Sequence, residues 1–348
     1  MQLKHLAPLA LAGAVTGQSL SDVLAAQSGK LSALTGLLAS NQTIYNVFAN
    51  AQNVTLLAPS NDAITAFSAS PMAAMLNETD FLAALLSYHV LAGTFYASNL
   101  SSPPNQQIPT LLTIPRYSNV TGAQRVVSKV DGNAVTFTSG NGASSTVQEA
   151  NLNFTGGTVH IIDKVLTIPT SLSDTLVAAN LSTLVGAVKQ AGLVDTLNQA
   201  ADVTVLAPKD AAFDAISSLV ANLSVADLTA VLGYHVITGS AIYSNDIKDG
   251  AKVKSLQGTE LTFRVVDGNV FVNGAKVVQA NLLANNGVVH VIDTVLNPAS
   301  PSAAPNVTAA TTSPAPTSTG GVVTAGAPMQ TAALGLAVLF GGVGIMAL

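Results

Sequence analysis

Two nearly identical stretches, Gly157 to Asp163 (GTVHIID) and Gly287 to Asp293 (GVVHVID), decide how this chain is organised. Each places a histidine inside a short apolar run, which is typical of a buried β-strand. The two stretches lie about 130 residues apart, whereas solenoid units repeat every 20–50 residues. This separation predicts two duplicated domains rather than a solenoid.

The rest of the chain supports the duplication, because further elements recur in the same order. These are Ser19–Leu24 and Ser171–Leu176, Val54–Pro59 and Val203–Pro208, Phe67 and Phe213, Tyr88–Val90 and Tyr234–Val236, and Ala150–Leu152 and Ala280–Leu282. The first copy has about sixteen extra residues, which we place around Leu100 to Gln124. This segment contains four prolines, so we expect a surface loop there.

The sequence predicts that each repeat consists of helices followed by strands. Ser21 and Ser173 are candidate helix caps, and Asn61 and Asp210 are candidate helix starts after a buried strand. Before each Tyr-His pair, apolar residues and the histidine follow at helical spacing (Leu82, Leu85, Leu86 and His89; Leu228, Val231, Leu232 and His235), after Ser224 in the second copy. Asp-Gly-Asn turns then separate candidate hairpin strands. Helices grouped early and strands grouped late indicate an α+β domain.

These motifs resemble the fasciclin domain family. The strand–helix signature stands at residues 55–63 and 204–212, the Tyr-His dipeptide at residues 88–89 and 234–235, and the Val-His ending at residues 159–166 and 289–296. The resemblance covers nearly all of residues 18–298. It implies two tandem domains, each a wedge of β-sheet with packed helices, and an extracellular adhesion role.

The resemblance also implies a partner-binding site at the Tyr-His pairs, Tyr88 with His89 and Tyr234 with His235. Receptors of the integrin kind are the partners associated with this region of the family, and a walled organism would offer glycans or polysaccharide instead. Because both histidines lie on an apolar helix stripe, the alternative is that they are core residues.

No pattern for catalysis, a metal or a cofactor stands out. His160 and Asp163, like His290 and Asp293, are three positions apart, which on a strand places them on opposite faces. The chain has no Cys, no Gly-x-Ser-x-Gly elbow, no phosphate loop and no His-Glu-x-x-His. We therefore expect no enzyme, no metal site and no cofactor. The net charge of −5, without a basic cluster, argues against nucleic acid as a partner.

The two ends of the chain are typical of a secreted, anchored protein. Residues 1–17 fit a signal peptide, with a short buried helix as the alternative. Residues 18–168 and 169–298 are the expected domains, and the Ser/Thr/Pro-rich residues 299–328 fit a glycosylated stalk. The apolar residues 329–348 fit a GPI-attachment signal, with attachment at Ser318 or Gly320, and a transmembrane helix is the alternative.

Glycosylation is also indicated by nine Asn-x-Ser/Thr sequons, which lie at Asn41, Asn53, Asn77, Asn99, Asn119, Asn153, Asn180, Asn222 and Asn306. Asn53 begins an expected buried strand, where a glycan would be disfavoured. Only 9% of the residues are charged, against about 25% in a typical domain. The low charge leaves each domain enough apolar residues for its own core.

The sequence therefore predicts a non-catalytic adhesion or cell-wall interaction protein at the cell surface. Its expected partners are surface receptors, wall polysaccharide or extracellular matrix, with the membrane reached through a GPI anchor. Two alternatives remain open, namely a surface module that binds a small molecule or lipid in a cleft between sheet and helices, and a purely structural wall glycoprotein.

Overall fold

The computed structural model describes residues 17–132, 134–216 and 223–298. The predicted stalk and GPI signal, nearly all of the predicted signal peptide, and the candidate residues Asn222, Asn306, Ser318 and Gly320 lie outside these ranges. Among the described residues, no helix has the length and apolar character needed to cross a membrane.

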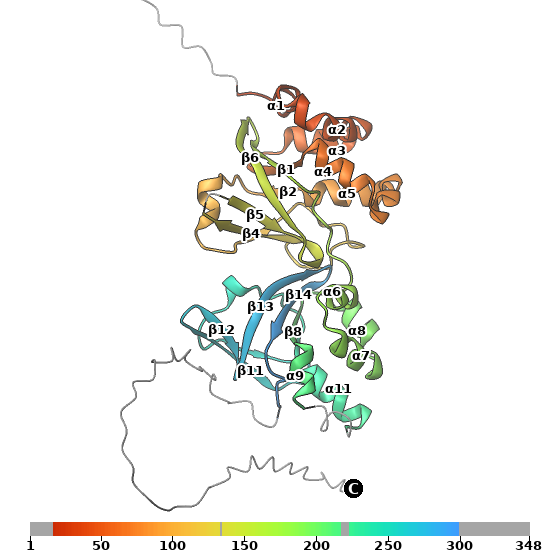
Figure 1. The fold of residues 1–348 in the computed structure, drawn as a ribbon, viewed down its shortest axis with the longest axis vertical. Helices are drawn as coiled ribbons and strands as arrows, with labels where there is room; N and C mark the ends of the chain where they lie inside the picture. Colours follow the sequence, from red (N-terminus) through yellow and green to blue (C-terminus); the bar gives the residue numbers. More distant parts are fainter. Residues whose placement is uncertain (1–16, 133, 217–222, 299–348) are drawn as a thin grey trace, which may run out of the picture. The chain divides into compact units, whose positions relative to one another are not determined.

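The first repeat opens with helices and ends with strands (Figure 1). Its elements are α1 (Leu20–Ala26), α2 (Ser28–Ser40), α3 (Gln42–Asn50), β1 (Val54–Pro59), α4 (Asn61–Ser68), the 3-10 helix η1 (Pro71–Asn77), α5 (Thr79–Tyr88), β2 (Val90–Ala92), η2 (Ala97–Ser101), β3 (Gln107–Pro109), β4 (Arg125–Asp131), β5 (Ala134–Thr138), η3 (Gly140–Gly142), β6 (Ser144–Phe154) and β7 (Gly157–Ile162).

The second repeat follows the same plan. Its elements are α6 (Leu172–Ala178), α7 (Ser182–Gln190), α8 (Val194–Gln199), β8 (Val203–Pro208), α9 (Asp210–Asp214), α11 (Val225–Tyr234), β9 (Val236–Ile237), η4 (Ser244–Asp246), β10 (Lys252–Lys254), β11 (Glu260–Val266), β12 (Asn269–Val272), β13 (Ala275–Ala284) and β14 (Gly287–Ile292). The α+β class and the duplication predicted from the sequence are confirmed.

Each repeat forms one seven-stranded sheet, and the strand order is the same in both. The first sheet runs β2-β1-β7-β6-β5-β4-β3, and the second runs β9-β8-β14-β13-β12-β11-β10. The strands that carry the two sequence signatures are central parallel neighbours, β1 beside β7 and β8 beside β14. Their register pairs Leu57 with His160 and Leu206 with His290, and each histidine strand has a paired strand on both sides.

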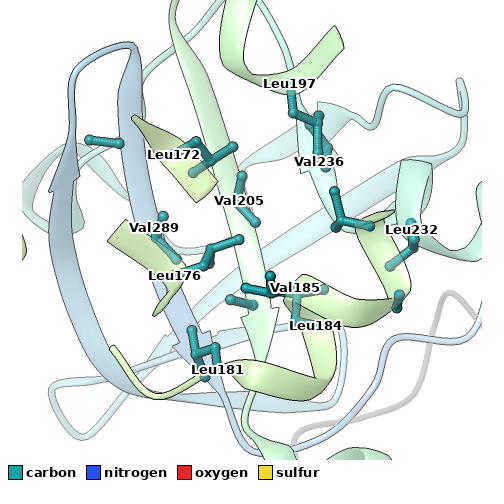
Figure 2. Packing of buried hydrophobic residues seen from close by; sticks show 14 of the residues in the cluster. Leu172, Leu176, Leu181, Leu184, Val185, Leu197, Val205, Leu232, Val236 and Val289 are labelled. Carbon is teal, nitrogen blue, oxygen red and sulfur yellow. The ribbon is translucent and has the colours of Figure 1, made fainter. Parts of the chain in front are cut away.

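Apolar side chains fill the space between the helices and the sheet. In the second repeat, Leu176 and Leu184 from the helices meet Val205 and Val289 from the central strands (Figure 2). The first repeat has an equivalent cluster between α1–α3 and its central strands. A second cluster in each repeat lies beneath the tyrosine of the Tyr-His pair. Burial of this kind supplies about 25 cal/mol for each Å² of apolar surface removed from water.

The caps of the first helix in each repeat differ from the prediction. Ser19, not Ser21, caps α1, and Ser171, not Ser173, caps α6. The hydroxyl of Ser19 accepts from the amide of Asp22 at 3.2 Å, and the Asp22 carboxylate accepts in return from the Ser19 amide at 2.9 Å. This reciprocal capping box needs an acidic residue three positions after the cap, which Ser21 lacks.

The other local signals are confirmed. Helices α4 and α9 begin at Asn61 and Asp210, and the Ser224 hydroxyl caps α11 by accepting from the Asp227 amide at 3.2 Å. The two residues between β11 and β12, Asp267 (φ 48°) and Gly268 (φ 74°), form the tight turn expected of Asp-Gly.

The inserted segment of the first repeat, residues 100–124, is more than a surface loop. It contains strand β3, whose Ile108 pairs with Val126 of β4. Leu100 and Leu112 are fully buried in the cluster around Tyr88. Proline spacing alone did not indicate this, because the apolar residues between the prolines show no regular period.

Candidate functional site

The two Tyr-His pairs, the candidate partner-binding residues, lie inside the fold. Tyr88 and Tyr234 have no exposed surface, and His89 and His235 are 3% and 2% exposed. Each tyrosine ends a helix, α5 or α11, and the histidine is the C-cap residue that follows. The part of these four side chains in partner binding stays a prediction.

The buried tyrosine hydroxyls hold the hairpin strand opposite the helix end. The Tyr88 hydroxyl donates to the carbonyl of Arg125 in β4 at 2.9 Å. In the second repeat, Asn273 donates to the Tyr234 hydroxyl at 2.8 Å, and that hydroxyl lies 3.4 Å from the Glu260 carbonyl. Burial raises the pKa of both phenols above the usual value, so both remain protonated donors.

Each motif histidine joins its helix to the end of its repeat. His89 Nδ1 donates to the Leu85 carbonyl at 2.7 Å, and Nε2 accepts from the Leu166 amide at 2.9 Å. His235 repeats both bonds, with Val231 and Leu296, each at 2.8 Å. A carbonyl can only accept and an amide N–H can only donate, so these contacts fix the neutral tautomer protonated at Nδ1. Burial lowers the pKa of both imidazoles to about 4.

The strand histidines carry their proton on the other ring nitrogen, Nε2. His160 Nε2 donates to the Phe95 carbonyl at 2.8 Å, while Nδ1 accepts from the Asn151 amide at 3.1 Å. His290 makes the corresponding bonds to Ile242 and Asn281. Burial lowers the pKa of both rings. Since every ring nitrogen of the four domain histidines faces a backbone group, these residues act as structural connectors in the fold.

Sequence reasoning noticed Asn151 and Asn281 as part of the repeat but gave them no role. Both have positive φ, 63° and 62°, which asparagine tolerates better than most residues. The Asn151 side-chain oxygen accepts from the Ala97 amide at 3.0 Å, and Asn281 accepts from the Ser244 amide at 2.9 Å. The recurrence of Ala-Asn-Leu in both copies was the signal that could have indicated this turn-holding role.

The strand-end carboxylates are also used within the fold. Asp163 accepts from the Thr146 amide at 2.6 Å, and Asp293 accepts from the Lys276 amide at 2.8 Å. Neither shares a cluster with its neighbouring histidine, and the described residues contain no group of three or more potential metal ligands.

The sequons within the described ranges lie at the surface. Asn53, Asn77, Asn99, Asn119, Asn153 and Asn180 are exposed and Asn41 is half-buried. Asn53 directly precedes β1, and its side-chain oxygen accepts from the Thr94 amide at 3.0 Å, so the expectation that a glycan is disfavoured there stays a prediction.

Two small pockets in the described part of the chain lie away from the space between sheet and helices. One, of about 230 Å³, is lined by residues that include Arg125, Asp202 and Tyr243. The other, of about 250 Å³, is lined by residues that include Ile242 and Phe263. The space where a lipid cleft was considered is occupied by the packed side chains of Figure 2.

Comparison with known proteins decides the family. A fasciclin-domain model matches residues 29–169 and again residues 179–298. The chain belongs to the fasciclin-domain family. Both fasciclin domains are present in tandem, and each carries the Tyr-His and Val-His elements described above.

The chain is similar to several proteins that contain fasciclin domains. It is 32% identical over 280 residues to a fasciclin-like arabinogalactan protein of Arthroderma benhamiae, covering 79% of this chain and 66% of that protein. It is 31% identical to the fasciclin-like arabinogalactan protein elcF of Phaeosphaeria nodorum, covering 83% and 91%. A transforming growth factor-beta-induced protein ig-h3 of Sus scrofa is 38% identical over 149 residues, covering 41% and 21%.

Among solved structures, the domain pair of the insect cell adhesion molecule Fasciclin I aligns with 78% of this chain and 98% of its own, at 19% identity and a TM-score of 0.40. The fasciclin family and these relatives indicate a non-catalytic role outside the cell or at its surface.

Proposed function

We propose that this protein is an adhesion or cell-wall interaction protein, displayed at the cell surface and without catalytic activity. The observation that carries the proposal is the complete fasciclin signature in both domains, with all its histidines used by the backbone inside the fold. Recognition therefore belongs to the outer surfaces, which also carry the exposed sequons.

The proposed attachment to the cell is a GPI anchor at Ser318 or Gly320. The support comes from the sequence, in which small residues, a polar spacer and an apolar end follow one another. The Ser/Thr/Pro-rich residues 299–328 would then space the two domains away from the membrane.

The proposed partners are wall polysaccharide, matrix or a surface receptor. Single fasciclin contacts of modest strength would be reinforced by many displayed copies, since avidity grows when binding becomes intramolecular. The Tyr-His pairs contribute to binding in this proposal by supporting the surface above them, because their side chains are buried.

The test begins with intact cells treated with a phosphatidylinositol-specific phospholipase. Release of the protein supports the anchor, whereas retention would assign the apolar end to a different attachment. The released protein is then titrated against purified wall polysaccharide and against matrix fractions. Saturable binding to one fraction supports the proposal, and a linear, unsaturable signal on all of them would contradict it in favour of a purely structural wall glycoprotein.

A further inference from the structure

The inserted segment of the first repeat does more than fold onto its own domain. The Tyr88 hydroxyl contacts Arg125, the first residue of β4, which lies 37 positions further along the chain. The Tyr234 hydroxyl contacts Glu260, the first residue of β11, which lies only 26 positions further along. Eleven of the extra residues of the first repeat therefore precede β4. These residues lie in the inserted segment, residues 100–124. Both repeats belong to one compact unit of the chain, and the segment contacts the second repeat at two places.

The first place is the end of the segment, at Asn119 and Thr121. The Asn119 amide donates to the Asn285 carbonyl at 2.6 Å, and the Asp202 amide donates to the Asn119 carbonyl at 3.3 Å. The Asp202 carboxylate accepts from the Thr121 amide at 2.7 Å and from the Thr121 hydroxyl at 2.6 Å. Hydrogen bonds to a charged acceptor are stronger than neutral ones, so this is the firmest of the contacts.

The second place is the start of the segment, around Asn105. Asn245 of η4 donates to the carbonyls of Pro104 and Asn105 at 3.1 and 3.2 Å. At the last residue of the segment, Gln124 donates from a buried side chain to the Ala284 carbonyl at 3.0 Å. Both ends of the insertion, which the second repeat lacks, therefore contact the second repeat.

Arg125, the residue after the segment, adds a cation–π contact to the second repeat. The guanidinium of Arg125 lies over the ring of Tyr243, 4.6 Å from its centroid, and Val127 joins Tyr243, Leu283 and Val288 in one apolar cluster. A cation over an aromatic face is attracted by the negative face of the ring, and the attraction is stronger when the pair is desolvated.

The equivalent tyrosine of the first repeat provides an internal comparison. Tyr96 precedes η2 as Tyr243 precedes η4. Tyr96 is 39% exposed, whereas Tyr243 is 1% exposed. The two residues share their place in the repeat and differ in that only Tyr243 lies beneath Arg125.

We propose that the insertion is a clamp through which the first repeat grips the second, so that the two fasciclin domains behave as one body. The clamp residues are Asn105, Asn119, Thr121, Gln124 and Arg125. Their contacts in the second repeat are Asp202, Tyr243, Asn245 and residues 284–285. The clamp is independent of the identity of any adhesion partner.

The test compares amide hydrogen exchange in the full chain and in a Thr121→Ala/Arg125→Ala variant. We expect the amides of Asn119 and Asp202 to exchange at least ten-fold faster in the variant. The amides of Leu57 and Leu206, which lie in the central strands, report whether each domain is still folded and should be unchanged.

Arg116→Ala is the matched control, because Arg116 lies in the same insertion but pairs with Glu78 of its own repeat. It should leave all four amides as they are in the original protein. Unchanged exchange of Asn119 and Asp202 in the clamp variant would overturn the proposal. So would equal acceleration of Leu57, since the two residues would then support the first domain itself.

Discussion

His89 Nε2 accepts a hydrogen bond from the amide of Leu166, 77 residues further along the chain, and so joins the end of helix α5 to the segment that closes the first repeat. His235 makes the same bond to Leu296 in the second repeat. The most recognisable dipeptide of the sequence therefore joins two distant parts of the fold in each repeat.

Removing this imidazole should destabilise the protein strongly. His89→Ala leaves the buried Leu166 amide without an acceptor and opens a cavity, which together cost about 2–4 kcal/mol in the free energy of unfolding. Denaturant unfolding measures the loss. Val47→Ala, at a 56% exposed helix position, is the control and should change stability by less than about 0.5 kcal/mol. An equally small effect of His89→Ala would contradict the connector role.

The same histidines should make the protein sensitive to acid. His89 and His235 have a pKa of about 4 in the folded protein, whereas an unperturbed imidazole has a pKa of about 6.5, so the unfolded chain binds more protons between these values. Stability is complete above pH 6.5 and falls as the pH drops toward 4, by about 3 kcal/mol for each histidine. Protonation also turns Nε2 from an acceptor into a donor that faces another donor.

Unfolding measured at pH 7.0, 5.5 and 4.5 checks this prediction. We expect the midpoint to fall at each step, and we expect the dependence to be shallower in a His89→Phe variant, whose starting stability is lower. A protein that is equally stable at pH 7.0 and 4.5 would show that these imidazoles are protonated in the folded state without penalty.

The glycine that opens each signature strand should tolerate no side chain. A Cβ atom at Gly157 or Gly287 would lie 1.9 Å from the carbonyl oxygen of Val54 or Val203, on the neighbouring parallel strand. Gly287→Ala should therefore cost about 3 kcal/mol or more. Gly186→Ala is the matched control, because its Cβ meets nothing within 4 Å, and helix propensity predicts about 0.5–1 kcal/mol of stabilisation there. Thermal unfolding of the two variants should shift in opposite directions.

The exposed sequons should carry glycans that the fold does not need. Glycopeptide mass spectrometry of the secreted protein should find modified Asn77, Asn99 and Asn153, which are all exposed. Enzymatic removal of the glycans should leave the unfolding midpoint nearly unchanged at low protein concentration. A large loss of stability on removal would mean that the sugars pack against the domains.

The sequence predicted the parts of this fold that depend on local chemistry. The Asp267-Gly268 turn, the Ser224 cap and the helix stripe ending at His235 follow from rules that apply within a few residues. The duplication was visible because the same elements recur in order, and this recurrence also placed the central strands.

Longer-range relationships could not be predicted in the same way. Spacing placed His89 on the apolar side of a helix but could not show that its second nitrogen meets Leu166. The candidate caps Ser21 and Ser173 were two residues late, since serine occurs at both positions and only the carboxylate geometry distinguishes them. The contact between Thr121 and Asp202 depends on how the two folded domains meet, and the spacing of residues along the sequence does not indicate such a contact.

The most direct test of the account compares wall binding by the original protein with that by a Tyr88→Phe/Tyr234→Phe variant. The substitution removes two buried hydroxyl groups and keeps the rings that fill the cores. After confirming that the variant is folded by its amide exchange, one titrates both proteins against the wall fraction that binds the released protein. We expect both proteins to bind saturably, with dissociation constants that agree within about two-fold. Loss of binding in a variant whose amide exchange matches that of the original protein would show that the tyrosine hydroxyls meet the partner directly and would contradict the proposal.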